Sequence, residues 1–298
     1  MSYITTDDGV HLYYEAAGEG EPILFMHEFG GHHLSWEPQI RHFSRRYRCI
    51  TYAARGWPPS DVPDDVAAYS QARAADDAIA VLTGLGIEKA HLVGLSMGAT
   101  AALEVSIRHP ERMLSMTVAA GGGGGSTDAE AKRRFQADCA AFARRIETEG
   151  LASMAELYCT GSARVQYRNK DVRGWEEFKR QFAEGSPRGR AMTMLGIQGA
   201  RVPFFEREEA LSRVQVPALV VVGDEDDGTI GLALFLKRTL PRCGLLMVPK
   251  TGHTINLEEP TVFNTAMEGF INSVEHDKWG ELDAVARQKH FLLPQSKA

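Results

Sequence analysis

The chain has 298 residues, of which 44% are hydrophobic and 24% are charged, and its formal net charge is -6. This balance excludes a disordered or collagen-like chain, and a chain of this length can bury a core without disulfides or structural metals. The acidic excess provides no basic surface for nucleic acid, so we expect no nucleic-acid partner. At roughly 100–200 residues per domain, the length allows one large domain or two small ones.

In the first part of the chain, strand-like runs alternate with helical patterns. The short apolar, β-rich runs are Val10–Ala17, Pro22–His27, Arg48–Tyr52, Ala90–Leu95 and Met113–Ala119. Apolar residues at helical spacing predict helices over Ser70–Leu85 and Met97–Arg108. This alternation predicts an α/β fold with a mostly parallel central sheet and helices on both faces.

The alternation stops at five consecutive glycines, Gly121–Gly125, and resumes only after Arg213. The residues in between show no clear strand and are typical of helices. Beyond them we expect two more strands, Pro217–Gly223 and Leu245–Pro249, and two more helices, Ile230–Leu240 and Pro260–Val274. The sequence therefore predicts a core of residues 1–120 and 214–276, a helical insert of residues 121–213 and a C-terminal extension of residues 277–298.

The cysteines and the N-terminal segment bear on the cellular compartment. None of the four cysteines forms a C-x-x-C pair, so we expect reduced, mostly buried thiols and no zinc or redox site. The polar start of the chain lacks the basic and apolar regions of a signal peptide. No apolar run approaches the ~20 residues of a membrane helix. We therefore expect a cytoplasmic protein with no membrane partner.

The strongest chemical signal is the pentapeptide Gly-Leu-Ser-Met-Gly at positions 94–98, a G-x-S-x-G motif centred on Ser96. It follows a predicted strand and opens a predicted helix, the context in which this motif holds a nucleophile on a sharp, strained turn. Glycines flank the serine because any side chain there would clash. The N-terminus of the following helix offers backbone N–H groups to an anion. The pattern predicts a nucleophilic serine at position 96.

A serine hydroxyl needs a base to take its proton, and the base needs an acid to hold its tautomer. Among ten histidines, His253 stands on a loop at the carboxyl end of the last predicted strand, where sites of open α/β sheets lie. Four carboxylates, Asp224–Asp227, follow the preceding strand at its carboxyl end. Such a run is typical of a solvated turn, but one of its members stands where the acid is expected.

Together these motifs resemble the α/β-hydrolase-fold family, in particular its esterases, perhydrolases and meta-cleavage hydrolases. The resemblance covers the chain from Tyr3 to Phe270 apart from the insert, and it rests on the segments PILFMHEFGG, RGWPPSD, AHLVGLSMGA, VVVGDEDD and KTGHTINLEEP. The order of serine, acid and histidine is that of the family. The resemblance implies that the acid is Asp226, with Asp224 as the alternative, and that the insert is a helical cap over the site.

The segment from His27 to Gly31 resembles the HGxGG loop of these hydrolases. The resemblance implies that the backbone N–H of Phe29 forms one half of an oxyanion hole and that of Met97 the other half. His27 then braces the loop and is not the base. Each such donor contributes about 10²–10³ in rate.

Two positions depart from the family pattern. Glu28 stands where relatives usually have glycine, and residues 53–56 read Ala-Ala-Arg-Gly where relatives often have Asp-x-Arg-Gly. Because a carboxylate near a developing oxyanion would raise its energy, Glu28 should point away, pair with Arg55 or another neighbouring cation, or contact substrate. The missing aspartate leaves Arg55 free, so we predict a structural ion pair between Glu28 and Arg55.

Candidates for the substrate pocket come from the loops and from the insert: Glu28, His32, Trp57, Tyr158 and Trp175. For His32, packing at a helix N-terminus is an equal alternative. Most apolar residues of the insert are expected to form its own core. A solvated face is expected for four of its arginines, Arg133, Arg134, Arg144 and Arg145.

The sequence thus predicts a serine hydrolase that cleaves a carboxylic ester or lactone of a small molecule through an acyl-enzyme on Ser96. A C–C bond hydrolase acting on a vinylogous diketone uses the same triad and stays open, as does perhydrolysis. An epoxide hydrolase or dehalogenase is disfavoured, because those relatives carry aspartate at the serine position. From another class, a non-catalytic small-molecule receptor on the same fold stays open. No cofactor or metal motif appears, so we expect neither, and the sequence leaves homo-oligomer formation open.

Overall fold

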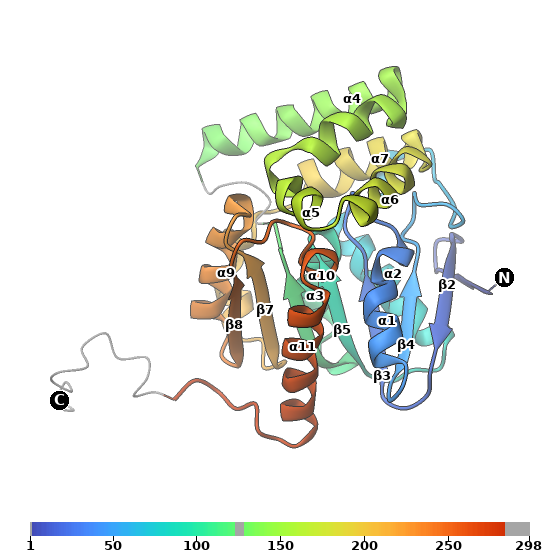
Figure 1. The fold of residues 1–298 in the computed structure, drawn as a ribbon. Helices are drawn as coiled ribbons and strands as arrows, with labels where there is room; N and C mark the ends of the chain where they lie inside the picture. Colours follow the sequence, from blue (N-terminus) through green and yellow to red (C-terminus); the bar gives the residue numbers. More distant parts are fainter. Residues whose placement is uncertain (1, 123–127, 284–298) are drawn as a thin grey trace, which may run out of the picture.

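A computed structural model describes residues 2–122 and 128–283 (Figure 1). Within these residues, one eight-stranded sheet has the strand order β1-β2-β4-β3-β5-β6-β7-β8. The strands are β1 (Ser2–Thr5), β2 (His11–Ala17), β3 (Pro22–Met26), β4 (Arg48–Tyr52), β5 (Ala90–Leu95), β6 (Met113–Ala119), β7 (Ala218–Gly223) and β8 (Cys243–Val248). Strand β2 runs antiparallel to both β1 and β4, and all other neighbours are parallel.

Helices cover both faces of the sheet and the edge where its parallel strands end. One face carries α2 (Gln71–Gly84), α3 (Met97–Arg108) and α9 (Asp227–Thr239), and the other carries α1 (Glu37–Phe43) and α11 (Pro260–Glu275). Between β6 and β7 come α4 (Ala129–Thr160), η4 (Ser162–Arg164), α5 (Val165–Lys170), α6 (Val172–Ala183), α7 (Pro187–Thr193), the π-helix η5 (Met194–Gly199), η6 (Phe204–Arg207) and α8 (Glu208–Ser212). The remaining short segments are η1 (His33–Trp36), η2 (Val66–Ala68), η3 (Pro110–Arg112) and α10 (Ile255–Glu258).

Alternation along the central strands builds two separate cores. In β3, Leu24 and Met26 are buried in the cluster under α2, α3 and α9, whereas Ile23 and Phe25 are buried in the cluster under α1 and α11. Successive side chains of a strand point to opposite faces, so a strand covered on both faces is apolar throughout. This is the reason that the central strands appear in the sequence as continuous apolar runs.

The sheet and its flanking helices confirm the predicted fold class, but the sequence did not predict strand β1 or helix α1, nor the short segments η1, η2, η3 and α10. Strand β1 has four residues with largely exposed side chains, and α1 has seven residues with only two buried. Neither therefore shows a periodic pattern of apolar residues in the sequence. Strand β8 begins at Cys243, two residues before the predicted start at Leu245.

Most of the segments between β6 and β7 form a layer above the carboxyl edge of the sheet, whereas η6 and α8 pack near α9 (Figure 1). We call η4, η5 and α4–α7 the upper helical layer. Its apolar side chains form a third buried cluster together with residues of the loops and turns at that edge. For example, Met154 and Phe182 of the layer share this cluster with Phe29 and Met97. The layer is therefore packed directly on the loops that carry the predicted site.

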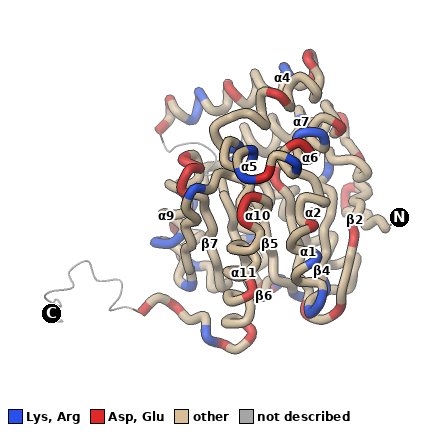
Figure 2. The backbone as a smooth tube through the Cα atoms, in the orientation of Figure 1, with Lys and Arg blue, Asp and Glu red and all other residues tan. Residues whose placement is uncertain are grey.

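The outer surface of α4 is charged. Figure 2 shows basic and acidic residues alternating along this helix. Arg134 pairs with Glu130, and Arg145 pairs with Glu149, in both cases four residues apart and exposed. Arg133 and Arg144 are exposed as well, so the four arginines lie on a solvated face as predicted. Exposed pairs of this kind contribute little to stability.

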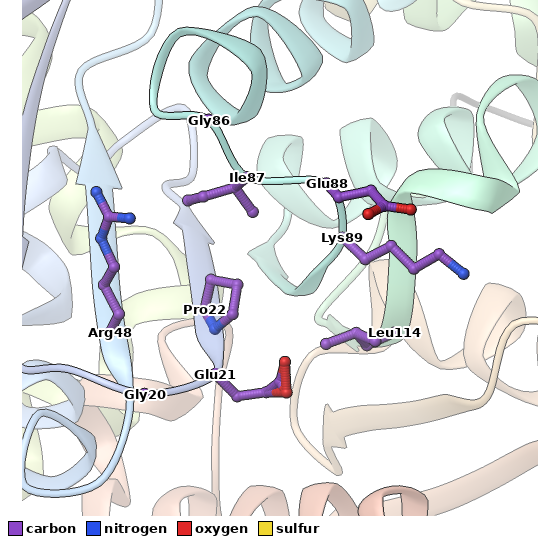
Figure 3. Close-up of a pocket in the computed structure, with 9 residues that line it drawn as sticks. All are labelled: Gly20, Glu21, Pro22, Arg48, Gly86, Ile87, Glu88, Lys89 and Leu114. Carbon is purple, nitrogen blue, oxygen red and sulfur yellow. The ribbon is translucent and has the colours of Figure 1, made fainter.

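A pocket of about 410 Å³ lies at the opposite edge of the sheet (Figure 3). It is lined by residues at the amino ends of the parallel strands, among them Pro22 of β3, Arg48 of β4 and Lys89 before β5. Since Ser96 follows the last residue of β5, this pocket is at the far end of the sheet from the predicted nucleophile.

Other sequence expectations concern the cysteines and the end of the chain. All four cysteines are free and buried, as predicted. Residues 284–298 of the predicted extension, like Gly123–Gly125, are outside the described part of the chain. Before them, Trp279 packs edge-on against Phe270 at 4.7 Å and donates to the carbonyl of Arg242 at 3.0 Å. In residues 2–122 and 128–283, no helix is both long and apolar enough to cross a membrane.

Candidate active site

Ser96 occupies a strained turn between β5 and α3. Its backbone has φ 53° and ψ -105°, a conformation that non-glycine residues rarely adopt. A Cβ on Gly94 would lie 2.2 Å from the backbone of Gly98, and a Cβ on Gly98 would lie 2.0 Å from the carbonyl oxygen of Met26. The two glycines of the motif are therefore required by close backbone packing, as the sequence predicted.

The loops after β7 and β8 bring a carboxylate and a histidine together. The backbone N–H of Glu225 donates to the carbonyl of Thr251 at 3.0 Å and ties the two loops. Nδ1 of His253 lies 2.7 Å from Oδ2 of Asp226. Asp224, the alternative acid, instead accepts a long contact of 3.4 Å from the Thr251 N–H. Of the two aspartates, Asp226 is the one that contacts the histidine.

Glu258 of α10 holds the histidine loop from the other side. Its buried carboxylate accepts the backbone N–H of Gly252 at 2.7 Å and that of Thr254 at 3.0 Å, so the two neighbours of His253 are both fixed. The His253 N–H donates to the carbonyl of Ala163 in the upper helical layer at 3.0 Å. Burial raises the pKa of Glu258, against the hydrogen bonds that lower it.

The environment of Asp226 favours its ionised form. Burial by itself would raise the pKa of this carboxyl. The His253 charge, hydrogen bonds from His253 and from Thr229 (2.6 Å), and the charge of Arg164 together outweigh burial, and the pKa of Asp226 is lowered. An ionised Asp226 can accept a hydrogen bond from the protonated Nδ1 of His253.

The loop after β3 is braced by His27. The Ala54 N–H donates to Nε2 of His27 at 3.1 Å, so Nδ1 carries the proton and donates to the Glu28 carbonyl at 2.8 Å. Burial holds the pKa of His27 well below its usual value, and the ring is neutral. In the described part of the chain, the backbone N–H groups of Phe29 and Met97 donate to no other residue. Within these residues, the fold itself uses neither donor.

The predicted ion pair between Glu28 and Arg55 is wrong. The buried carboxylate of Glu28 pairs with Arg164 of η4: Oε1 accepts from Nη1 at 3.0 Å, and Oε2 accepts from Nη2. Glu28 does form a structural ion pair, but its partner comes from the upper helical layer. The same Oε2 lies 4.0 Å from Nε2 of His253, so the pair is adjacent to the histidine.

Arg55 is occupied elsewhere. Its guanidinium makes two hydrogen bonds of 2.7 Å to the buried carboxylate of Asp77 on α2, and its Nη1 lies 2.9 Å from Asp8. Asp77 and Asp8 thus replace the aspartate that relatives often carry at position 53. The prediction failed because the substitute carboxylates come from α2 and from the loop before β2, outside the motif.

Two of the pocket candidates face the loop after β3. Tyr158 lies 5.9 Å from the ring of Phe29, and its hydroxyl accepts from Arg164 at 3.0 Å. Trp57 lies 6.0 Å from the ring of Phe29 and donates its indole N–H to the carbonyl of Gly31 at 3.0 Å. Both side chains belong to the surroundings of Phe29 and Glu28.

Apart from Glu28, the remaining candidates are His32 and Trp175, and both make contacts that stabilise the fold. His32 is the N-cap of η1, where Nδ1 accepts from the Leu34 N–H at 3.4 Å, so helix N-terminal packing describes it. Burial lowers the pKa of His32 to about 4. Trp175 donates to the carbonyl of Cys159 at 2.8 Å and packs inside the upper helical layer.

Sequence reasoning missed two buried arginines of the upper helical layer. Arg164 contacts Glu28, and Arg190 lies over the rings of Phe29 and Trp57 with Cζ at 5.4 and 4.5 Å from the ring centres. Neither belongs to a motif with fixed spacing. The one available signal was the unexplained Glu28, which required a cation from somewhere.

Fold and local geometry define the class of this protein. A serine on a strand-to-helix turn, with a histidine and a carboxylate on the loops of neighbouring strands, is the arrangement of an α/β hydrolase. The chain belongs to the alpha/beta hydrolase fold family, whose model matches residues 21–260.

Individual relatives agree with this class. The 3-oxoadipate enol-lactonase 1 of Acinetobacter baylyi is 28% identical, over 91% of this chain and 97% of its own. An esterase from Thermogutta terrifontis, solved with malate bound, is 25% identical with a TM-score of 0.80, over 92% of this chain and 98% of that one. An N-acyl homoserine lactone degrading enzyme is 26% identical with a TM-score of 0.73, over 90% and 100%. The predicted class, a hydrolase that acts on ester bonds, is confirmed.

Proposed function

We propose that the protein is a serine hydrolase that cleaves a carboxylic ester or lactone of a small molecule through an acyl-enzyme on Ser96. The observation that carries the proposal is the strained turn of Ser96 (φ 53°) at the same sheet edge as the 2.7 Å contact between His253 and Asp226. Similarity to an enol-lactonase, to an esterase and to a lactone-degrading enzyme supports the ester or lactone bond.

In the proposed reaction, His253 is the base. Its Nε2 takes the proton of Ser96 as the serine oxygen attacks the carbonyl carbon, and Asp226 holds the Nδ1 proton and stabilises the imidazolium. The leaving alcohol departs with the proton from His253. A water, activated by the same Nε2, then attacks the acyl-enzyme and releases the acid.

The oxyanion of each tetrahedral intermediate is received by the backbone N–H groups of Phe29 and Met97 in this proposal. One such donor is worth about 10²–10³ in rate. An unpaired Glu28 would oppose this effect, because a carboxylate close to the oxyanion raises its energy. Arg164 bonds both oxygens of Glu28 and cancels that repulsion.

We propose further that residues 121–213 act as a cap on a core formed by residues 1–120 and 214–276. The upper helical layer supplies Arg164 to Glu28 and the carbonyl of Ala163 to the His253 backbone. Both contacts join the cap to loops of the core. The cap therefore takes part in shaping the site and does more than cover it.

The test is the hydrolysis of p-nitrophenyl butyrate by the Ser96→Ala variant. Loss of the nucleophile should lower kcat/KM by about 10³–10⁶. Ser212→Ala, which removes an exposed hydroxyl of α8, is the matched control and should leave kcat/KM unchanged. Retained turnover in Ser96→Ala, with both variants folded by circular dichroism, would contradict the proposal. A lactone and a meta-cleavage diketone assayed beside the ester separate the reactions that share this triad.

A further inference from the structure

Arg190 is a buried cation without an anionic partner. Its side chain on α7 is 1% exposed. Nη2 donates to the carbonyl of Gly31 at 3.3 Å, while Nε and Nη1 have no hydrogen-bond partner in the described part of the chain. Over the same residues, 2–122 and 128–283, no carboxylate forms an ion pair with Arg190. Most of its donors are therefore unused.

This arrangement is costly for the folded protein as it stands. Burial lowers the pKa of Arg190 to about 9, against the weaker opposing effects of Tyr158, Glu28 and Cys159. The group nevertheless keeps its charge at neutral pH. A buried ion without a counter-ion destabilises the folded protein, and each unsatisfied donor adds to that cost. An anion that binds there would remove both penalties.

Three aromatic rings fix the guanidinium in place. Its Cζ lies 4.5 Å from the ring centre of Trp57, 4.9 Å from that of Phe182 and 5.4 Å from that of Phe29. Ring contacts stabilise the cation but accept no conventional hydrogen bond from its N–H groups. The rings leave the coplanar N–H donors of the guanidinium without acceptors. A carboxylate matches their geometry, because its two oxygens can accept two parallel hydrogen bonds.

The backbone around Arg190 is held at a fixed distance from the core. Its neighbour Gly189 packs on Gly56 so closely that a Cβ would lie 1.9 Å from the Gly56 carbonyl oxygen. Arg190 then contacts the loop after β3 at two places, the ring of Phe29 and the carbonyl of Gly31. Phe29 is also the proposed oxyanion donor. Arg190 therefore lies against the loop that carries the proposed oxyanion donor.

The neighbouring charges do not neutralise Arg190. Glu28 is near enough to attract it, but both oxygens of Glu28 bond Arg164. Asp226 bonds His253 and Thr229. The charges of Arg164 and Glu28 cancel each other. The positive charge of Arg190, which comes from the upper helical layer, is not cancelled by a neighbouring carboxylate.

We infer that Arg190 binds a carboxylate of the substrate, so that the preferred ester or lactone carries a second, ionised carboxyl group. The preference for a particular ester or lactone rests on the proposed function, whereas the binding of a carboxylate by Arg190 does not. Fully buried and bidentate, such a contact is expected to change affinity about ten- to a hundredfold.

The kinetic test compares three half-esters with neutral ethyl esters of equal chain length. The pairs are monoethyl adipate with ethyl hexanoate, monoethyl glutarate with ethyl pentanoate, and monoethyl succinate with ethyl butanoate. Wild-type protein should hydrolyse at least one half-ester with a kcat/KM about tenfold or more above that of its neutral counterpart. In Arg190→Met this ratio should fall toward one, mainly through KM. Arg190→Lys should keep part of the ratio, because it retains the charge without the planar fork.

The control is Arg188→Met on the same helix. Arg188 is half-exposed and pairs with Glu147 on the outer surface, so its loss should leave the substrate ratio unchanged. A wild-type preference for the neutral ester over the whole series would overturn the inference. So would a full acid preference in a folded Arg190→Met protein.

A binding measurement separates this inference from the proposed function. Free adipate, glutarate and succinate are titrated calorimetrically into the Ser96→Ala protein, with and without Arg190→Met. Binding that disappears with Arg190 supports the inference even if no ester is hydrolysed. Ester hydrolysis that depends on Ser96, with no dicarboxylate binding and no acid preference, overturns the inference and leaves the proposed function intact. If Arg190→Met does not fold, Arg190→Lys and the wild-type substrate ratio give the same decision.

Discussion

The sheet core and the upper helical layer differ in how they build the candidate site. The core positions Ser96 and His253 through backbone packing: two glycines without room for a Cβ, a positive φ, and loops joined by backbone hydrogen bonds. The upper layer contributes charged side chains, Arg164 and Arg190, that are buried against the loop after β3. In our proposal, the core therefore carries out the reaction, whereas the charged side chains of the upper helical layer select the substrate.

After that of Ser96→Ala, the largest effect is expected in the core, from Asp226→Asn. Asparagine cannot hold His253 in the tautomer that leaves Nε2 free, so kcat should fall about 10⁴-fold. Steady-state hydrolysis of p-nitrophenyl butyrate measures it. Asp224→Asn, two residues away and without contact to the ring, should retain most activity. Equal losses in the two variants would remove the distinction between the two carboxylates.

The variant Arg164→Met tests the ion pair that joins the upper helical layer to Glu28 of the core. This change leaves the carboxylate of Glu28 unpaired on the residue before Phe29, the proposed oxyanion donor. Repulsion of the oxyanion should then lower kcat by about 10²–10³, the contribution of one oxyanion donor. The double variant Glu28→Gln/Arg164→Met removes the repelling charge and should recover most of that loss. A double variant no better than Arg164→Met would show that the layer acts by packing and not by charge.

A smaller effect, on stability, is expected from Glu258→Ala in the core. The backbone N–H groups of Gly252 and Thr254 lose their acceptor, which costs about 1–3 kcal/mol in the free energy of unfolding. Urea denaturation measures it. Glu259→Ala, which removes a half-buried partner of Lys170, is the control and should cost less than about 1 kcal/mol. A loss in the control as large as that in Glu258→Ala would count against the role of Glu258 in the histidine loop.

The smallest effect is a pH dependence. The folded environment lowers the pKa of Asp226 below its usual value of 3.8. A carboxyl with a lowered pKa stabilises the fold fully above its unfolded pKa, and this stabilisation is lost as pH falls through the folded value. The unfolding free energy of wild type relative to Asp226→Asn should therefore decrease from about pH 5 to about pH 3. A difference that stays constant over this range in urea titrations would contradict the assigned direction.

The same comparison explains what the sequence could predict. The turn around Ser96 and the two loops after β7 and β8 require particular residues because backbone atoms approach closely there. Their motifs can therefore be recognised in the sequence. Glu28 was recognised as a carboxylate that needs a cation, but its partner lies 136 residues further along the chain. No spacing rule connects them, and only the packing of η4 on the core brings them together.

Arg55 and Arg190 show the two opposite failures of sequence reasoning. The sequence predicts a free Arg55 because position 53 is alanine and not aspartate, whereas α2 supplies Asp77 as the partner of Arg55. Arg190 carried no signal, because a buried arginine and an exposed one look alike in a helix of seven residues. Burial in the upper layer is set by how that layer docks, and this is a property of the tertiary structure.

The central claim, covalent catalysis by Ser96, is tested most directly by trapping the acyl-enzyme. Protein mixed with p-nitrophenyl butyrate is quenched in acid within the first turnovers, digested and examined by mass spectrometry. The account predicts a butyryl adduct on the peptide that contains residues 94–98, absent from Ser96→Ala and retained in Ser212→Ala. Hydrolysis that proceeds at full rate with no adduct on that peptide, or with an adduct on another residue, would contradict the account.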